Sequence, residues 1–359
     1  MLFNDETVNM IRENSLEMER AGSLTQQVLN IIYENGLFKL FVPEEFGGKM
    51  MGLPDALKIF EQASRIDGSF GWLVNIGSGG GYFIPSILPT VSQEVFSDKK
   101  AVIAGSGFPS GTAERVDGGF VVNGQWKYCS GSTHATVFTA NCKVEGSETS
   151  SNPEIRSFIL LPEQVKIVQD WKAFGLKATA SHSIAVENAF VPEEMTFDIF
   201  GNRSYYDHPV YQYPFVQFAQ TSFTAVSIGI CKHFLDEAKQ LSQQNKEAWQ
   251  TSHRYDFVIN KINDMEQLLA RSSDDFYKTI AESWKTHARH KQLSKHQQEE
   301  ISRQCKETTR VALTCAQSIL PYLGINAIME DTPVNQTWRD LHTACQNTLV
   351  VPFYDIDIN

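Results

Sequence analysis

The stretch FVVNGQWKYCSGSTHATVF, residues 120–138, gives the strongest local prediction in this sequence. It opens with β-formers, and Asn123-Gly124 is a strong hairpin signal, so we expect two short strands and a turn. Trp126 and Tyr128 alternate with polar neighbours and are expected to face one side of a sheet. The small polar run that ends at His134 lets a flat ligand approach backbone amides closely. Such a site suits a planar cofactor with a polar edge, although a strand Trp is more often core and a Ser-Gly-Ser run is more often a plain turn.

The bulk composition predicts a globular protein of more than one packed unit. The chain has 359 residues, of which 42% are hydrophobic and 20% charged. That length exceeds a typical single core, and that composition is typical of soluble proteins. The net charge of −11 and the lack of a basic cluster disfavour nucleic-acid binding. An apolar run of about 18 residues is absent, so we predict no membrane span.

The six cysteines are scattered, without the CxxC or Cys/His spacing of a metal site, so we expect no metal. The N-terminal stretch MLFNDETVNM lacks the charged and apolar regions of a signal peptide. These features favour a reduced, cytoplasmic setting.

The hydrophobic period changes twice along the chain. Helical spacing covers most of residues 5–100 and 212–350, whereas residues 101–195 carry short strand patterns with irregular spacing, as in a small barrel. In the helical parts, Leu53 to Ile66 is an amphipathic segment, Gly324 ends a helix, and Asp331-Thr332-Pro333 starts the last one. The glycine-rich run at 105–111 is predicted as a loop, but it lacks the GxGxxG pattern of a phosphate-binding loop. Residues 145–154 are predicted as a polar surface loop. We predict an α+β fold, mostly α, because helices and strands are segregated. The chain is predicted to form three domains: a helical domain over residues 1–100, a β-barrel over residues 101–200 and a helical bundle over residues 201–359.

Five stretches occur in this order along the chain: GLF and VPEEFGG at 36–38 and 42–48, DGSFGW at 67–72, GQWKYCSG at 124–131, GLKATASH and FVP at 175–182 and 190–192, and WRD at 338–340. Together they resemble the acyl-CoA dehydrogenase superfamily, and the resemblance covers nearly the whole chain. The resemblance implies an N-terminal helical domain, a central β-barrel and a C-terminal four-helix bundle. It also implies FAD or FMN as cofactor and a homotetramer or homodimer.

Three further features are FPSGTA at 108–113, the pattern Trp126-x-Tyr128-x-Ser130-Gly131 leading to His134, and WRDLHTA at 338–344. They make the sequence more similar to the flavin-dependent monooxygenases within that superfamily. This resemblance implies a component that takes reduced FMN or FAD from a separate flavin reductase. Its substrate would be a small aromatic molecule or a heteroatom compound.

One departure concerns the catalytic base. Common acyl-CoA dehydrogenases take a Glu from a stretch shortly after Arg-Asp, but residues 345–349 here are CQNTL, and Asn347 stands where related monooxygenases often have a His. An amide cannot remove an α-proton. The alternatives are therefore an acyl-CoA dehydrogenase with a base elsewhere, or a flavoprotein without catalytic activity.

The resemblance also implies site residues. We expect Ser130 or Ser132 to hydrogen-bond the N5 region of the flavin and His134 to assist proton transfer, with Asn347 at the position of the missing base. The expected cofactor contacts are Phe108, Trp126, Ser130, Gly131, Ser132, Ala178, Thr179 and Arg339, although Arg339 also suits an ion pair within the bundle. The aromatic candidates for a substrate pocket, which also suit a core, are Phe83, Phe108, Phe174, Tyr211, Tyr213 and Phe215.

Overall fold

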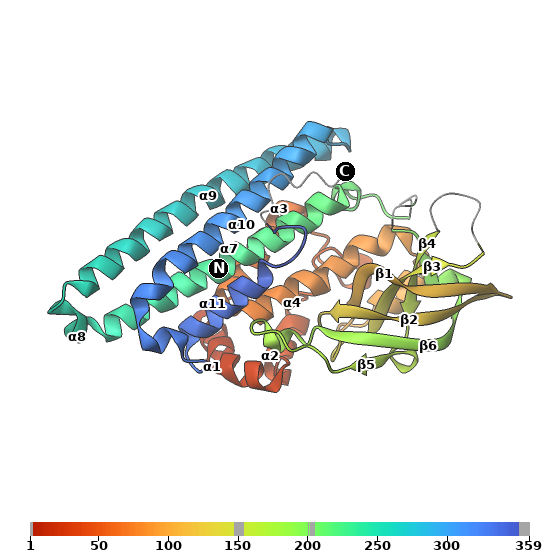
Figure 1. Ribbon diagram of the computed structural model, residues 1–359. Helices are drawn as coiled ribbons and strands as arrows, with labels where there is room; N and C mark the ends of the chain where they lie inside the picture. The colour runs from red at the N-terminus through yellow and green to blue at the C-terminus, as the bar shows by residue number, and fades with distance from the viewer. Residues whose placement is uncertain (1–2, 147–153, 200, 202–204, 352–359) are drawn as a thin grey trace.

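Helices from both ends of the chain pack together beside a single sheet formed by its middle (Figure 1). This computed structural model describes residues 3–146, 154–199, 201 and 205–351. Part of the predicted surface loop at 145–154 lies outside these residues. Within the described residues, no helix is both long and apolar enough to cross a membrane.

The N-terminal helices follow the predicted period. They are α1 (Asp5–Ala21), α2 (Gln26–Glu34), α3 (Leu53–Ile66), α4 (Gly68–Gly79) and α5 (Pro89–Phe96). Helix α3 has the predicted bounds. The break after it is a single extended residue, Asp67, whose carboxylate accepts a hydrogen bond from the Phe70 N–H at 2.8 Å and so caps α4. The chain therefore turns sharply from α3 into α4, which leads toward the sheet.

The strands form one seven-stranded sheet in the order β5-β6-β2-β1-β3-β4-β7. Their bounds are β1 (Ile103–Val116), β2 (Gly119–Cys129), β3 (Val137–Val144), β4 (Ile155–Leu160), β5 (Lys166–Val168), β6 (His182–Pro192) and β7 (Thr196–Phe197). Strands β1 and β3 pair in parallel and the other pairs are antiparallel. Among the described residues the end strands β5 and β7 do not pair with each other, so the expected closed barrel is an open mixed sheet.

The predicted hairpin at Asn123-Gly124 is wrong. Strand β2 continues through both residues, and the turn lies earlier, where Val116 pairs with Gly119. Gly124 is needed for a different reason: a Cβ there would lie 2.7 Å from the Cα of Gly111 on the neighbouring strand. The glycine-rich run at 105–111, predicted as a loop, lies inside β1 and carries an irregularity in the pairing with β3.

The C-terminal helices are α6 (Pro209–Gln212), α7 (Phe215–Gln244), α8 (Lys246–Gln250), α9 (Arg254–His290), α10 (Lys295–Leu323) and α11 (Pro333–Ala344). The long helices α7, α9 and α10 lie side by side, while α3 and α11 pack against α7 (Figure 1). Gly324 follows α10 and Pro333 begins α11, as predicted.

The core contains several residues that the sequence offered for a substrate pocket. Tyr211 and Tyr213 are fully buried, and their hydroxyls bond to the Phe41 carbonyl and the Ser283 hydroxyl at 2.7 and 2.8 Å. They are core residues, because their polar ends are satisfied inside the protein. All six cysteines are free and buried: Cys129 and Cys142 in the core of the sheet, and Cys231, Cys305, Cys315 and Cys345 in that of the helices.

Candidate functional site

Two of the motifs that predicted a cofactor site lie against each other. One is the turn over residues 128–134 after β2, and the other is the segment 176–181, which contains the short helix η4 (Lys177–Thr179). The Gly131 N–H donates to the Thr179 carbonyl, and the Ser132 hydroxyl donates to the Ala180 carbonyl, both at 2.8 Å. These bonds join segments about fifty positions apart and fix the backbone of both.

The same two segments contain unusual backbone conformations. Tyr128, Leu176 and Ala180 have φ values of 65°, 51° and 45°, in the left-handed region that residues with a side chain rarely adopt. Such conformations persist only where the surroundings hold them, and they gather at functional sites. Here the cross-links between the turn and η4 provide the restraint.

A row of side-chain hydrogen bonds runs through the junction. The Trp72 indole of α4 donates to the Ser130 hydroxyl at 3.0 Å, and Ser130 lies 2.7 Å from the Ser181 hydroxyl. Ser181 is 2.7 Å from the Thr179 hydroxyl, which donates to the Leu176 carbonyl at 2.7 Å. Trp72 also stacks on Phe223 of α7, with ring centroids 5.2 Å apart, so α4, α7 and the β2 turn meet at this point.

The position of Trp126 corrects one prediction. Its side chain is fully buried in the core of the sheet, and its indole N–H donates to the Asn141 carbonyl at 2.8 Å. A ring without exposed surface does not line an open site, so Trp126 supports the sheet and does not contact a cofactor in this conformation. The exposed ring of the same strand is Tyr128, which meets Trp171 edge to face.

His134 lies at the end of the turn. Its ring stacks on Phe38 with centroids 5.6 Å apart, and a Cβ on Gly131 would lie 3.1 Å from its Nε2. This buried nitrogen has no hydrogen-bond partner among the described residues. Burial lowers the pKa of His134 from 6.5 to about 4, so the imidazole is neutral near pH 7. A neutral ring with an unpartnered nitrogen is suited to bind a polar group of a ligand.

The other expected cofactor contacts differ in exposure. Ala178 and Thr179 are buried in η4, next to the turn. Phe108 is exposed on the irregular part of β1, and Phe174 is half exposed and packs edge to face on Trp338. The structure thus brings Ser130, Gly131, Ser132, Ala178, Thr179 and His134 together, while Phe108 has no described contact with this group.

Arg339 is bound within its own chain. Its Nε donates to Asn335 at 2.7 Å, and its terminal nitrogens contact both Glu19 oxygens at 2.7 and 2.9 Å. The same nitrogens donate to the carbonyls of Phe174 and Glu330 at 2.5 and 3.3 Å. Because a guanidinium has five N–H groups, none is left for a phosphate. In this arrangement Arg339 forms an ion pair, as one of the two expectations had it, but the partner Glu19 lies on α1 and not within the C-terminal bundle.

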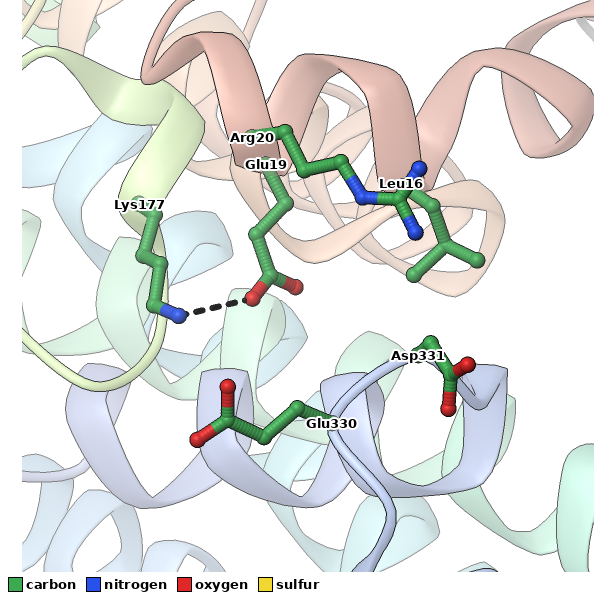
Figure 2. Close-up of a pocket in the computed structure, with 6 residues that line it drawn as sticks. All are labelled: Leu16, Glu19, Arg20, Lys177, Glu330 and Asp331. Carbon is green, nitrogen blue, oxygen red and sulfur yellow. Dashed lines mark ion pairs between the residues drawn. The ribbon is translucent and has the colours of Figure 1, made fainter.

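Beside this ion pair lies a pocket of about 220 Å³ between α1, η4 and the segment before α11 (Figure 2). Lys177 contacts Glu19 Oε1 at 2.9 Å, and Arg339 contacts the same oxygen, so one buried carboxylate holds two cations. The residues that line the pocket are Leu16, Glu19, Arg20, Lys177, Glu330 and Asp331. Its small volume and mixed charges do not suit a flavin ring.

Asn347 follows α11 and has a local role. Its side-chain oxygen accepts the Leu349 N–H at 3.0 Å, and no described contact joins it to Ser130 or His134. Two residues that the sequence did not assign to the site, Trp72 and Ser181, complete the hydrogen-bonded row. Both lie inside quoted motifs, but only the fold shows that they meet. Across the described residues, no group of three or more His, Cys, Asp and Glu is arranged to hold a metal.

Comparison with known proteins agrees with this architecture. The models "Acyl-CoA dehydrogenase, N-terminal domain" and "Acyl-CoA dehydrogenase, C-terminal domain" match residues 4–89 and 221–352. This chain belongs to the acyl-CoA dehydrogenase superfamily. The two matched regions contain helices from both sides of the sheet in the chain.

Superfamily members with similar sequences include the indole-3-acetate monooxygenase of Pseudomonas putida, 26% identical over 93% of this chain and 86% of the relative. Another is the flavin-dependent monooxygenase, oxygenase subunit HsaA, of Rhodococcus jostii, 24% identical over 94% of this chain and 91% of the relative.

Two solved structures share the fold. The 3-HSA hydroxylase from Rhodococcus sp. RHA1 superposes with a TM-score of 0.88 at 22% identity, covering 97% of this chain and 92% of that one. FMN-bound TdsC from Paenibacillus sp. A11-2 gives 0.75 at 18% identity, covering 97% and 93%.

Proposed function

We propose that this protein is a flavin-dependent monooxygenase that uses reduced FMN or FAD and oxidises a small aromatic molecule or a heteroatom. The observation that carries the proposal is the pairing of the 128–134 turn with η4 around buried hydroxyls and the His134 Nε2, which has no hydrogen-bond partner among the described residues. The names of the relatives, monooxygenases and an oxygenase subunit, support the same class of reaction.

The residues at this junction fit a flavin. Gly131 lets the turn lie close to His134, since a Cβ there would be 3.1 Å from its Nε2. The Ser130 hydroxyl and this Nε2, which has no hydrogen-bond partner among the described residues, are the polar groups offered to a ligand. A solved neighbour binds FMN. When bound, a reduced flavin supplies two electrons to O₂, so that one oxygen atom enters the substrate and the other leaves as water.

The chain's own contribution is binding, orientation and exclusion of water. Ser130 is proposed to contact the N5 edge of the ring. His134 is proposed to hold a polar group of the ligand and to assist proton transfer. Its lowered pKa of about 4 keeps the ring neutral at neutral pH, so that one ring nitrogen can accept a hydrogen bond. Trp72 and Phe223 close the junction with apolar surface, which limits water.

The acyl-CoA dehydrogenase alternative is disfavoured by the segment after α11. That reaction needs a base for an α-proton, and Asn347 instead bonds to the backbone of its own turn. A non-catalytic flavoprotein is distinguished by the experiment below.

The test supplies reduced FMN or FAD to the purified protein without oxygen and then adds isotopically heavy O₂ with indole or phenol as probe. One labelled oxygen atom in the probe is the expected result. Bleaching of tightly bound oxidised FAD by an acyl thioester would indicate a dehydrogenase instead. A flavin that binds without oxidising any probe would support the non-catalytic alternative.

The assembly is also a proposal. A flavin reductase is the proposed partner, because one relative is named an oxygenase subunit. A homotetramer or homodimer in the cytoplasm is proposed as well.

We propose the division into domains at 1–100, 101–200 and 201–359, with the last as a four-helix bundle of α7, α9, α10 and α11. An exposed apolar patch near the start of α9 and the end of α10 suits contact between copies. It consists of Phe257, Tyr322, Ile325, Ile328 and Met329.

A further inference from the structure

The row of hydrogen bonds from Trp72 to the Leu176 carbonyl has a fixed direction. A carbonyl oxygen only accepts, so the Thr179 hydroxyl must use its hydrogen on Leu176, 2.7 Å away. Thr179 then has only lone pairs for Ser181, also at 2.7 Å, and Ser181 must donate to it. If Ser181 did not donate to Thr179, lone pairs of the two hydroxyl oxygens would face each other at 2.7 Å.

The same reasoning reaches Ser130. Because the hydrogen of Ser181 points to Thr179, the 2.7 Å contact between Ser130 and Ser181 forms only if Ser130 donates. At its other side Ser130 accepts the Trp72 indole N–H, which is a donor only, at 3.0 Å. Ser130 has therefore used its hydrogen and one lone pair, and one lone pair is left.

The two redox states of a flavin differ at N5. The reduced ring has an N–H there and donates, whereas the oxidised ring has a lone pair and accepts. An oxygen that offers only a lone pair bonds to the first and repels the second. At a site this buried, a mismatched acceptor reduces affinity about 10- to 100-fold.

We propose that Ser181 and Thr179, anchored on the Leu176 carbonyl, are positioning residues that hold Ser130 as a hydrogen-bond acceptor and make the site prefer reduced over oxidised flavin. This inference rests on the proposed function, because it takes the turn after β2 as the flavin site. Neither residue needs to touch the ring for this effect. Trp72 locates the Ser130 oxygen but does not set the direction of the row.

The experiment measures dissociation constants of reduced and oxidised FMN, and of FAD, under anaerobic conditions for the whole chain. Wild type is expected to bind the reduced form at least about 10-fold more tightly. A tenfold ratio raises the two-electron midpoint potential of the bound flavin by about 30 mV, which gives a second readout. A wild-type ratio near one would overturn the proposal.

Ser181→Ala removes the acceptor of the Ser130 hydrogen, so Ser130 becomes able to donate to oxidised N5. The affinity for oxidised flavin should rise, and the preference for reduced over oxidised flavin should fall about 10-fold. Structural damage would not increase the affinity for oxidised flavin. Thr179→Val tests the same point without altering Ser181, which becomes free to donate to Ser130. Unchanged ratios in both variants, with flavin still bound, would overturn the inference and leave the proposed function standing.

Two control variants separate the effect of hydrogen-bond direction from a general effect on side-chain packing. Trp72→Phe should weaken both redox states alike and keep their ratio. Ser157→Ala removes a buried hydroxyl elsewhere in the sheet, bonded to Asn141 at 2.6 Å, and should leave both constants unchanged. If wild type and all variants bind neither FMN nor FAD in either redox state, the proposed flavin site itself is rejected.

Discussion

His134 makes protein stability depend on pH. The pKa of its imidazole is lowered by burial to about 4, while in an unfolded chain it returns to 6.5. As the pH falls from 6.5 toward 4, the unfolded chain gains a proton that the folded chain does not, so the folded state loses stability.

We therefore expect His134→Phe to remove about 2 kcal/mol of the loss that wild type shows between pH 7 and pH 5, measured by urea unfolding at each pH. The exposed His296 on α10 provides the control, since His296→Gln should retain the wild-type dependence. Equal pH dependence in wild type and His134→Phe would contradict the assignment of the effect to this imidazole.

Trp126 tests whether the ring belongs to the sheet or to the site. Trp126→Phe removes its bond to the Asn141 carbonyl and reduces buried volume, so unfolding free energy should fall by about 1–3 kcal/mol. Flavin affinity of the folded variant should stay within about twofold of wild type, because the ring has no surface to offer a ligand. A large loss of affinity at unchanged stability would show direct contact instead.

Helices α1 and α11 are joined by the buried pair of Glu19 and Arg339. Arg339→Gln removes one cation from a nearly inaccessible carboxylate, so we expect a loss of about 3–5 kcal/mol in unfolding free energy. Because Lys177 remains paired with Glu19, the expected loss of unfolding free energy lies at the lower end of this range.

The matched control is Arg65→Gln, which breaks a pair with Asp236 that is largely open to solvent. That change should cost less than about 1 kcal/mol. Similar losses in both variants, by chemical unfolding, would show that burial does not strengthen the pair between α1 and α11.

The sequence predicted the helices better than the contacts between elements. Helical period gave α3 its bounds and placed α7, α9, α10 and α11, because such spacing is a local property. Asn123-Gly124 misled the prediction of the hairpin, since the glycine serves close approach of two strands rather than a turn. The partners of Ser130 and Arg339 come from distant elements, and no local pattern reports which donors are already used.

At the scale of the whole molecule, the exposed apolar patch at the start of α9 and the end of α10 provides a test of assembly. Phe257 and Tyr322 pack edge to face there, 5.0 Å between ring centroids, with Ile325 and Ile328 exposed nearby. If the patch joins copies, the double change Ile325→Lys and Ile328→Lys should reduce the mass found by sedimentation while leaving the helical circular dichroism unchanged.

The control for that experiment is Val216→Lys, a similar change of an exposed aliphatic residue at the start of α7. It should keep the wild-type mass. A wild type that sediments as a monomer would contradict the proposed homo-oligomer.

Because buried cysteines lie in both the sheet and the helical layer, their reactivity can be used to detect local opening of each part. Two cysteines lie inside the sheet and four inside the helical layer, all free and inaccessible. An alkylating reagent therefore marks each site only when that part of the protein transiently opens. Peptide mass spectrometry over time would then show whether the sheet or the helical layer opens first, without any substitution in the chain.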